Sequence, residues 1–148
     1  MIREDYVSFE TAKLLKEKGF DAYCHSYYYP YYEDDTMKKK NYGRYRGTVN
    51  IKNKLYYEVY DRKGLMKDHY LCPTIQMAMK WLRDVHDLII SVSFTVHGWL
   101  CDITKVFRDS NGFIVNINHG IGDDSLPYCD EHEEACEAAI KYCLENLI

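Results

Sequence analysis

The stretch from Pro73 to Val96 constrains the fold more than any other part of this chain. Its first half has apolar residues at helical spacing, typical of a helix with one core-facing stripe: Ile75, Ala78, Met79, Leu82 and Val85. After Asp87 the period changes to two, and the residues expected to face inward are Leu88, Ile90, Val92, Phe94 and Val96. The sequence therefore predicts a helix that leads directly into a strand with one buried face.

The remaining patterns extend this unit to an α+β domain. We expect a helix from Phe9 to about Lys18 with Ser8 as its cap, and a last helix whose apolar stripe ends near Leu147. Strands are predicted at 22–29, 55–60, 99–107 and 113–118, with a weaker one at 48–52. The order α-β-β-α-β-β-β-α predicts a mostly antiparallel sheet of about five strands with three helices mainly on one face.

A chain of 148 residues fits a single domain spanning 1–148. Pro30 either ends the first strand or marks it as an edge strand. The segment 33–47 has charge runs and no periodicity, so we expect a mobile, basic hairpin tip that joins the first strand to the one at 55–60.

Charge is distributed unevenly along the chain. Between Lys38 and Lys67 there are ten basic and two acidic residues, a net charge of +8. From Ile121 to Ile148 there are eight acidic residues and one lysine, a net charge of −7. Such asymmetry points to electrostatic partners and does not bear on the fold.

The basic segment supports two hypotheses about function. Tyrosine and arginine are favoured at protein interfaces, and the basic hairpin of one copy could meet the acidic helix of another, so a protein partner or a homodimer is the first. The second is sequence-tolerant nucleic-acid binding, because aromatic rings stack on unpaired bases while cations follow the phosphates. The candidate binding residues are Lys38, Lys39, Lys40, Tyr42, Arg44, Tyr45 and Arg46.

Met77 and Trp81 form a second apolar ridge on the central helix. They are four residues apart, so they touch each other, yet they lie outside the main stripe. A second ridge packs either against another layer of the same protein or against a partner. We therefore add both residues to the candidate binding set.

Candidate chemistry is present but unspecific. His69-x-x-Cys72 and Cys129-x-x-His132 are loose zinc-type pairs of opposite order, and Cys24-His25 or Cys101 with His97 or His119 could form a thiol–imidazole pair. No signature of a metal site or a thiol hydrolase surrounds these residues. We expect no enzymatic activity, no catalytic residue, no metal, no cofactor and no small-molecule substrate.

Two resemblances bear on this interpretation. The order from Thr74 onward resembles double-stranded-RNA-binding domains, but their basic final-helix start is replaced here by DEHEEACE, which would repel phosphate. The segments FETAKLLKEKGFD, PTIQMAMKWLRDVH and EEACEAAIKYCLENLI resemble small proteins of Bacteroides and related gut bacteria that have no assigned activity. That resemblance implies a cytoplasmic location. The absence of a secretory signal, of a membrane-spanning apolar run and of a disulfide framework agrees with it.

Overall fold

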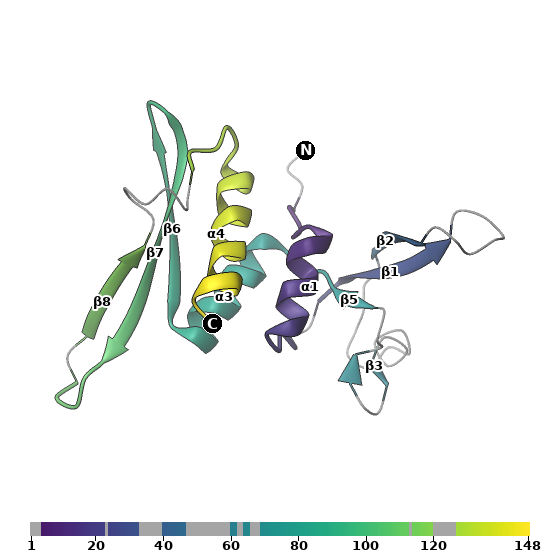
Figure 1. Cartoon of the computed structure of the whole chain (residues 1–148), viewed down its shortest axis with the longest axis horizontal. Coiled ribbons are helices and arrows are strands. Elements are labelled where there is room, and N and C mark those ends of the chain that lie inside the picture. The colour runs from purple at the N-terminus through teal and green to yellow at the C-terminus, as the bar shows by residue number, and fades with distance from the viewer. Residues whose placement is uncertain are drawn as a thin grey trace. The chain divides into compact units, whose positions relative to one another are not determined.

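The computed structural model describes the chain in segments, shown in Figure 1. These are residues 4–22, 24–32, 40–46, 60–61, 64–65, 69–112, 114–119 and 127–148; for some strand residues, Lys40, Tyr45 and Arg46 among them, only the backbone is described. The chain divides into two compact units. The N-terminal unit is Tyr6–Thr74, and the C-terminal unit is Met1–Asp5 with Ile75–Ile148.

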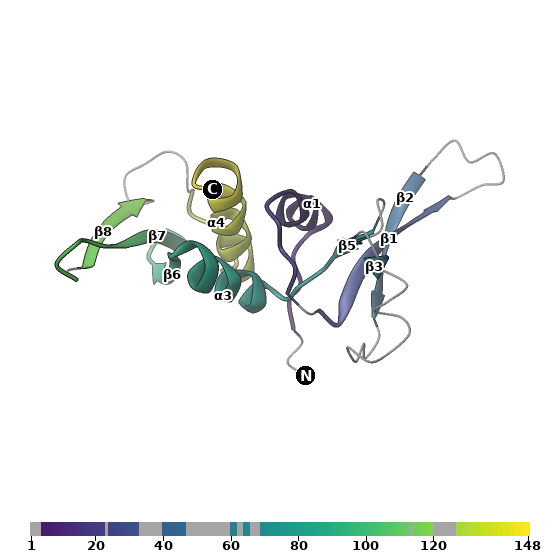
Figure 2. The same ribbon diagram turned by 90° about the horizontal axis from the view of Figure 1, so that it is seen from below.

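The N-terminal unit packs helix α1 (Phe9–Glu17) next to a small antiparallel sheet. The strands are β1 (Ser26–Tyr32), β2 (Lys40–Arg46) and β5 (Tyr70–Leu71), in the order β2-β1-β5; Figure 2 shows β1 and β2 side by side. A separate pair joins β3 (Tyr60–Asp61) to β4 (Gly64–Leu65). The cap prediction for α1 is confirmed, because the Ser8 side chain accepts a hydrogen bond from the Thr11 amide at 3.3 Å.

Two predictions for this unit are corrected. The segment expected to be a loop between 33 and 47 contains β2, and β2 rather than a strand at 55–60 is the partner of β1. Tyr42 pairs with Pro30, and Tyr31 pairs with Asn41, so the polar run carries a regular ladder that its lack of periodicity concealed. Residues 33–39 and 47–59 lie outside the described part of the chain.

Pro30 lies inside β1 rather than at its end. Strand β5 pairs with β1 only at Tyr27 and Tyr28, so β1 has no partner at Pro30 on that side within the described residues. A proline has no amide hydrogen to donate and is tolerated where a strand has a free edge. Among the described residues Pro30 therefore lies at an edge, the second of the two alternatives predicted for it.

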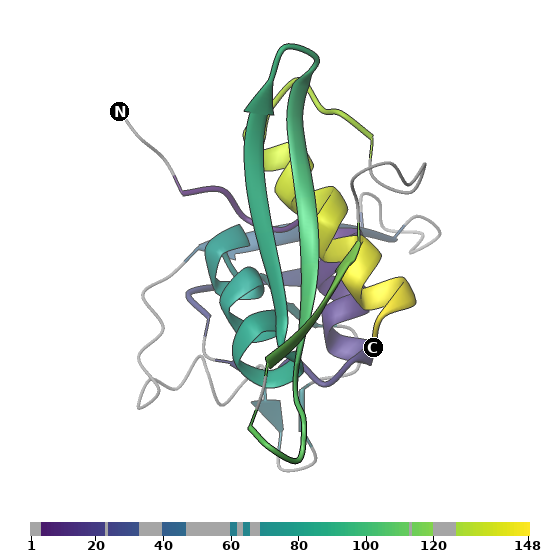
Figure 3. The same ribbon diagram turned by 90° about the vertical axis from the view of Figure 1, so that its left-hand side faces the viewer.

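The C-terminal unit places two helices on one face of a three-stranded antiparallel sheet (Figure 3). The helices are α3 (Ile75–His86) and α4 (His132–Asn146). The strands β6 (Leu88–Thr95), β7 (Gly98–Arg108) and β8 (Ile114–His119) form a meander in the order β6-β7-β8. These boundaries confirm the predicted helix-to-strand transition after Asp87 and the two strands that follow.

The core of this unit lies between α4, α3 and the sheet. Leu82 of α3, Leu88 of β6, Ile103 of β7, and Ile140 and Leu144 of α4 have no accessible surface. Burial of such side chains is the main contribution to stability in a layered fold. The apolar stripe predicted for α3 is wrong at its last residue, Val85.

Val85 is 58% exposed although its position around the helix lies among the buried residues. It occupies the last turn before the chain reverses at Asp87, which has a φ of 57°. Helical spacing places a side chain around the helix axis but does not say where along the axis the covering layer ends.

The fold class is α+β, as predicted. The described residues form three helices and eight strands, and every strand pairing among them is antiparallel. The predicted sheet of about five strands is replaced by three smaller sheets. None of the helices in the described ranges is long and apolar enough to cross a lipid bilayer.

The substitution Leu144→Ala tests the packing of α4 on the sheet. Because Leu144 is fully buried, we expect the free energy of unfolding to fall by about 3 kcal/mol, from lost transfer energy and the cavity left behind. Urea unfolding followed by circular dichroism measures the change. The neighbouring exposed Glu145→Ala serves as the matched control and is expected to change stability by less than about 0.5 kcal/mol. Equal effects of the two variants would contradict this packing.

Candidate interaction surfaces

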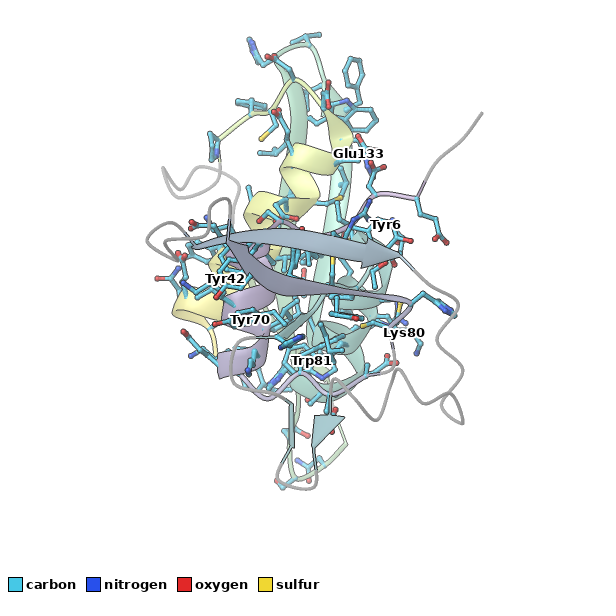
Figure 4. All side chains as sticks on the ribbon, turned by 90° about the vertical axis from the view of Figure 1, so that its right-hand side faces the viewer. Tyr6, Tyr42, Tyr70, Lys80, Trp81 and Glu133 are labelled. Atoms are coloured by element: carbon cyan, nitrogen blue, oxygen red, sulfur yellow. The ribbon has the colours of Figure 1, made fainter. Side chains whose placement is uncertain are left out.

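An aromatic cluster centred on Phe9 joins the elements of the N-terminal unit. Its ring stacks on Tyr42 of β2, with centroids 4.1 Å apart and planes inclined by 23°. Tyr28 of β1 and Tyr70 of β5 meet it edge-on at 5.5 and 5.4 Å. Figure 4 labels Tyr42 and Tyr70, whose ring centroids are 5.8 Å apart. The tyrosines of the cluster are half-buried, so their rings contribute to the packing of the unit.

Two cationic side chains of this unit lie over tyrosine rings. The Arg44 guanidinium carbon is 4.0 Å from the centroid of the Tyr6 ring, and Lys16 Nζ is 4.8 Å from that of Tyr70. Lys16 also donates a hydrogen bond to the His69 carbonyl at 3.1 Å. These are cation–π contacts between a charged group and a ring face. Of the predicted cationic residues, Arg44 is the one whose side chain is described, and it is exposed.

The other predicted residues of the basic segment are described only in part. Lys38 and Lys39 lie outside the described residues, and Lys40, Tyr45 and Arg46 have a backbone position in β2, opposite Tyr32, Tyr27 and Ser26 respectively. The nucleic-acid hypothesis assigns base stacking to Tyr42 and Tyr45. One face of the Tyr42 ring is covered by Phe9, so this face is not open to stacking on a base.

The side chains of the Met77–Trp81 ridge are largely shielded from solvent. Trp81 is only 7% exposed, and its ring meets that of His86 with centroids 4.6 Å apart. Met77 is half-buried. Trp81 is thus buried, and its ring contact with His86 lies within α3 itself.

A second group of aromatic side chains, with the exposed Val96 of the turn beside it in sequence, lies at the end of the β6–β7 hairpin. We call it the hairpin-end cluster, made of Phe94, Val96, His97, Trp99, Tyr128 and His132. Phe94 faces Trp99 across the ladder at 5.0 Å, and Trp99 meets His132 at 5.0 Å with perpendicular planes. His97 meets Tyr128 at 5.5 Å. The cluster thus joins the hairpin to the segment that leads into α4.

Backbone contacts hold the hairpin-end cluster together. The Trp99 amide donates to the Cys129 carbonyl at 2.8 Å, and the Cys129 amide donates back at 2.9 Å. A Cβ added at Gly98 would lie 2.6 Å from the Cys129 carbonyl oxygen, and Gly98 has a φ of 122°. Only glycine fits this position without a shift of the backbone, because both the space and the conformation exclude a side chain.

Three large side chains of this cluster are exposed. Phe94 is 71% exposed, Val96 96% and Tyr128 51%. The sequence predicted that Phe94 and Val96 face inward. That prediction is wrong, because both side chains are exposed. The alternation holds at the start of β6, where Leu88 is buried, but the cover by the helices decreases toward the turn. Strand alternation carries no information about where the covering helices end.

Two buried thiols, Cys24 and Cys101, are poor nucleophiles at neutral pH. Burial, reinforced by the neighbouring Cys72, raises the pKa of the Cys24 thiol to about 12. A hydrogen bond with Cys136, together with burial, raises the pKa of Cys101. Thiolates are the reactive form, so these environments keep both residues protonated. Within the described part of the chain, no group of three or more His, Cys, Asp or Glu side chains could hold a metal ion.

Comparison of the chain with protein-family models, curated proteins and solved structures gives no match. The resemblance to proteins of gut bacteria therefore stays a prediction.

His86 gives a testable pH dependence. Burial, followed by the nearby Lys105, lowers the pKa of this imidazole, and its Nε2 is buried with no hydrogen-bond partner among the described residues. Below about pH 6.5 the unfolded chain therefore binds a proton that the folded chain resists. We expect this contribution to stability to be present above pH 6.5 and to be lost as the pH falls from there through the lowered pKa of the folded state.

Urea unfolding at a series of pH values from 7.5 to about 5 measures this effect. His86→Gln should reduce the slope of stability against pH, whereas the exposed His97→Gln should follow the wild type. Parallel slopes for wild type and His86→Gln would show that His86 does not titrate differently in the two states.

Proposed function

We propose that this chain is a non-enzymatic protein-interaction module that makes contact through the hairpin-end cluster. The observation that carries the proposal is the exposure of Phe94, Val96 and Tyr128 at one end of a well-paired hairpin. Single exposed apolar residues are ordinary, but a group of them on neighbouring segments is typical of a contact site for a protein. Aromatic residues are also enriched where such contacts carry most of the binding energy.

The surroundings of the cluster favour a protein over other ligands. Acidic residues follow it at the start of α4, among them Glu133 and Glu134, so the surface disfavours phosphate and anionic lipid. The raised pKa values of the Cys24 and Cys101 thiols disfavour a thiol-based reaction at these two residues. The resemblance to proteins of gut bacteria agrees with a cytoplasmic location for such a module.

A retention experiment tests the proposal. Immobilised wild-type protein is offered a cell extract of its source and, separately, a tagged second copy of the chain. We expect the double variant Phe94→Ser/Val96→Ser to retain at least about tenfold less protein than the wild type, because it lacks the exposed apolar contacts. Binding should persist at high salt, since such contacts are not ionic.

The matched control is Phe107→Ser, which removes another partly exposed aromatic side chain from β7 but leaves the hairpin end intact. It should retain as much protein as the wild type. An equal loss of retained protein in the double variant and in Phe107→Ser would rule out the hairpin-end cluster as the contact surface. Unchanged retention by the double variant would rule it out as well.

Nucleic-acid binding is the second candidate function, favoured by the exposed Arg44 over Tyr6 within the basic segment. It is weaker because Tyr28, Tyr42 and Tyr70 of that unit pack on Phe9. Fluorescence anisotropy with a mixed-sequence single-stranded oligonucleotide separates the two. We expect no saturable binding at about 0.15 M salt; binding that falls steeply with salt and weakens with Arg44→Ala would favour nucleic acid instead.

A further inference from the structure

Strand β6 is an edge strand without the usual protection of an edge. Among the residues that the structure describes, β7 is its only ladder partner, and Figure 3 shows it as the outer strand of its sheet. Its sequence, LIISVSFT, has no charged residue and no proline over eight positions. Natural edge strands usually carry a lysine, a proline or a bulge that prevents pairing with another chain. An unprotected edge is therefore a surface that can accept a strand.

The printed hydrogen bonds show which backbone groups of β6 point outward. The Val106 amide donates to the Asp87 carbonyl, so Asp87 and every second residue after it face β7. Independently, Trp99 exchanges its bonds with Cys129, so its ladder neighbour Phe94 has no backbone bond to it. The amides and carbonyls directed away from the sheet are thus those of Leu88, Ile90, Val92 and Phe94.

The same residues present an incomplete apolar row. Leu88 is buried, Ile90 and Val92 are half-buried, and Phe94 is largely exposed. An added strand would pair with the free backbone groups and cover this row at once, which is how strand addition combines affinity with side-chain contacts.

We propose that the occupant of this edge is a second copy of the chain, and that two β6 strands pair antiparallel about a two-fold axis at Ser91. This inference rests on the proposed function and names its partner. In this register Ile90 of one copy pairs with Val92 of the other, and Leu88 with Phe94. Every outward-facing backbone group of the four residues then meets a group of the second copy.

Charge favours a second copy as the occupant. A two-fold axis brings two identical strands together, so a charge on the edge close to the axis would lie near the same charge of the second copy, and β6 has none. The whole segment Ile75 to Thr95 carries two basic residues, Lys80 and Arg83, and two acidic ones, Asp84 and Asp87, so its net charge is zero. The acidic helix α4 packs mainly on β7, the strand farther from the axis.

The two-fold axis also brings uncovered apolar residues together. The exposed Phe94 of one copy lies opposite Leu88 of the other. In that other copy, Leu88 follows the exposed Val85, at the end of α3, by three residues. The single chain leaves both Phe94 and Val85 in solvent, at opposite ends of the same edge. Pairing of the two strands removes part of this apolar surface from water.

Light scattering behind a sizing column tests the inference, with the full chain loaded at several concentrations. We expect a mass twice the 17.6 kDa of the chain. Ser91→Lys should raise the dimer dissociation constant at least about tenfold, because it places two like charges at the axis. Ser91 is exposed in the single chain, so the fold should be unchanged by circular dichroism. The matched control Asn111→Lys, in the exposed turn after β7, should remain dimeric.

Cysteine cross-linking tests the register. In an antiparallel pair without mutual hydrogen bonds, Cα atoms lie about 4.5 Å apart, within disulfide range. Ser91→Cys should therefore form a covalent dimer under mild oxidation, above the level that wild-type protein gives. In Ser93→Cys the two sulfurs would be about 13 Å apart along the strands and should not cross-link.

Three outcomes overturn the inference. They are a monomer at all concentrations, a dimer dissociation constant unchanged by Ser91→Lys, and cross-linking of Ser93→Cys rather than Ser91→Cys. A monomeric wild type that still retains another protein through Phe94 and Val96 would leave the proposed function standing without a dimer. A dimer disrupted by Ser91→Lys and unaffected by Phe94→Ser/Val96→Ser would support the paired edge and reject the hairpin-end cluster as the main contact.

Discussion

The pairing of β6 with β7 is the constraint on which the rest of the C-terminal unit depends. A two-residue turn at Val96 and His97 sets the register, with Thr95 opposite Gly98. Because side chains alternate along both strands, this register decides which residues meet α3 and α4 and which face solvent. It also decides which backbone groups are used inside the sheet and which point outward from β6. The core and the proposed edge of this unit are consequences of one ladder.

In the N-terminal unit a comparable role belongs to Phe9. It is the first residue of α1, and the Ser8 cap and the ladder of β1 with β2 bring it against Tyr42. Aromatic rings that fill space in this way give up part of the surface they could offer to a ligand. The high tyrosine content of this region therefore supports packing first, and a surface such as that of Arg44 over Tyr6 is what remains for recognition.

Periodicity predicted the C-terminal unit well because its signals are local. The stripe of α3 and the alternation of β6 were correct in type and boundary. The errors lie at the ends of these elements, where Val85 and Phe94 are exposed although their positions match the buried pattern. In the N-terminal unit β2 was missed, since KNYGRYR carries no alternation of apolar and polar residues and its pairing with β1 is not a local property.

The sequence by itself determined the α+β class, the element types of the C-terminal unit, the helix-to-strand transition at Asp87 and the uncharged composition of β6. These follow from side-chain chemistry at fixed spacings along the chain. Only the tertiary structure decided that β6 is an edge, that Trp81 is buried, and that Phe94, Val96 and Tyr128 stay in solvent. Exposure and edge position depend on how far neighbouring elements extend, and that distance is set by contacts between residues remote in sequence.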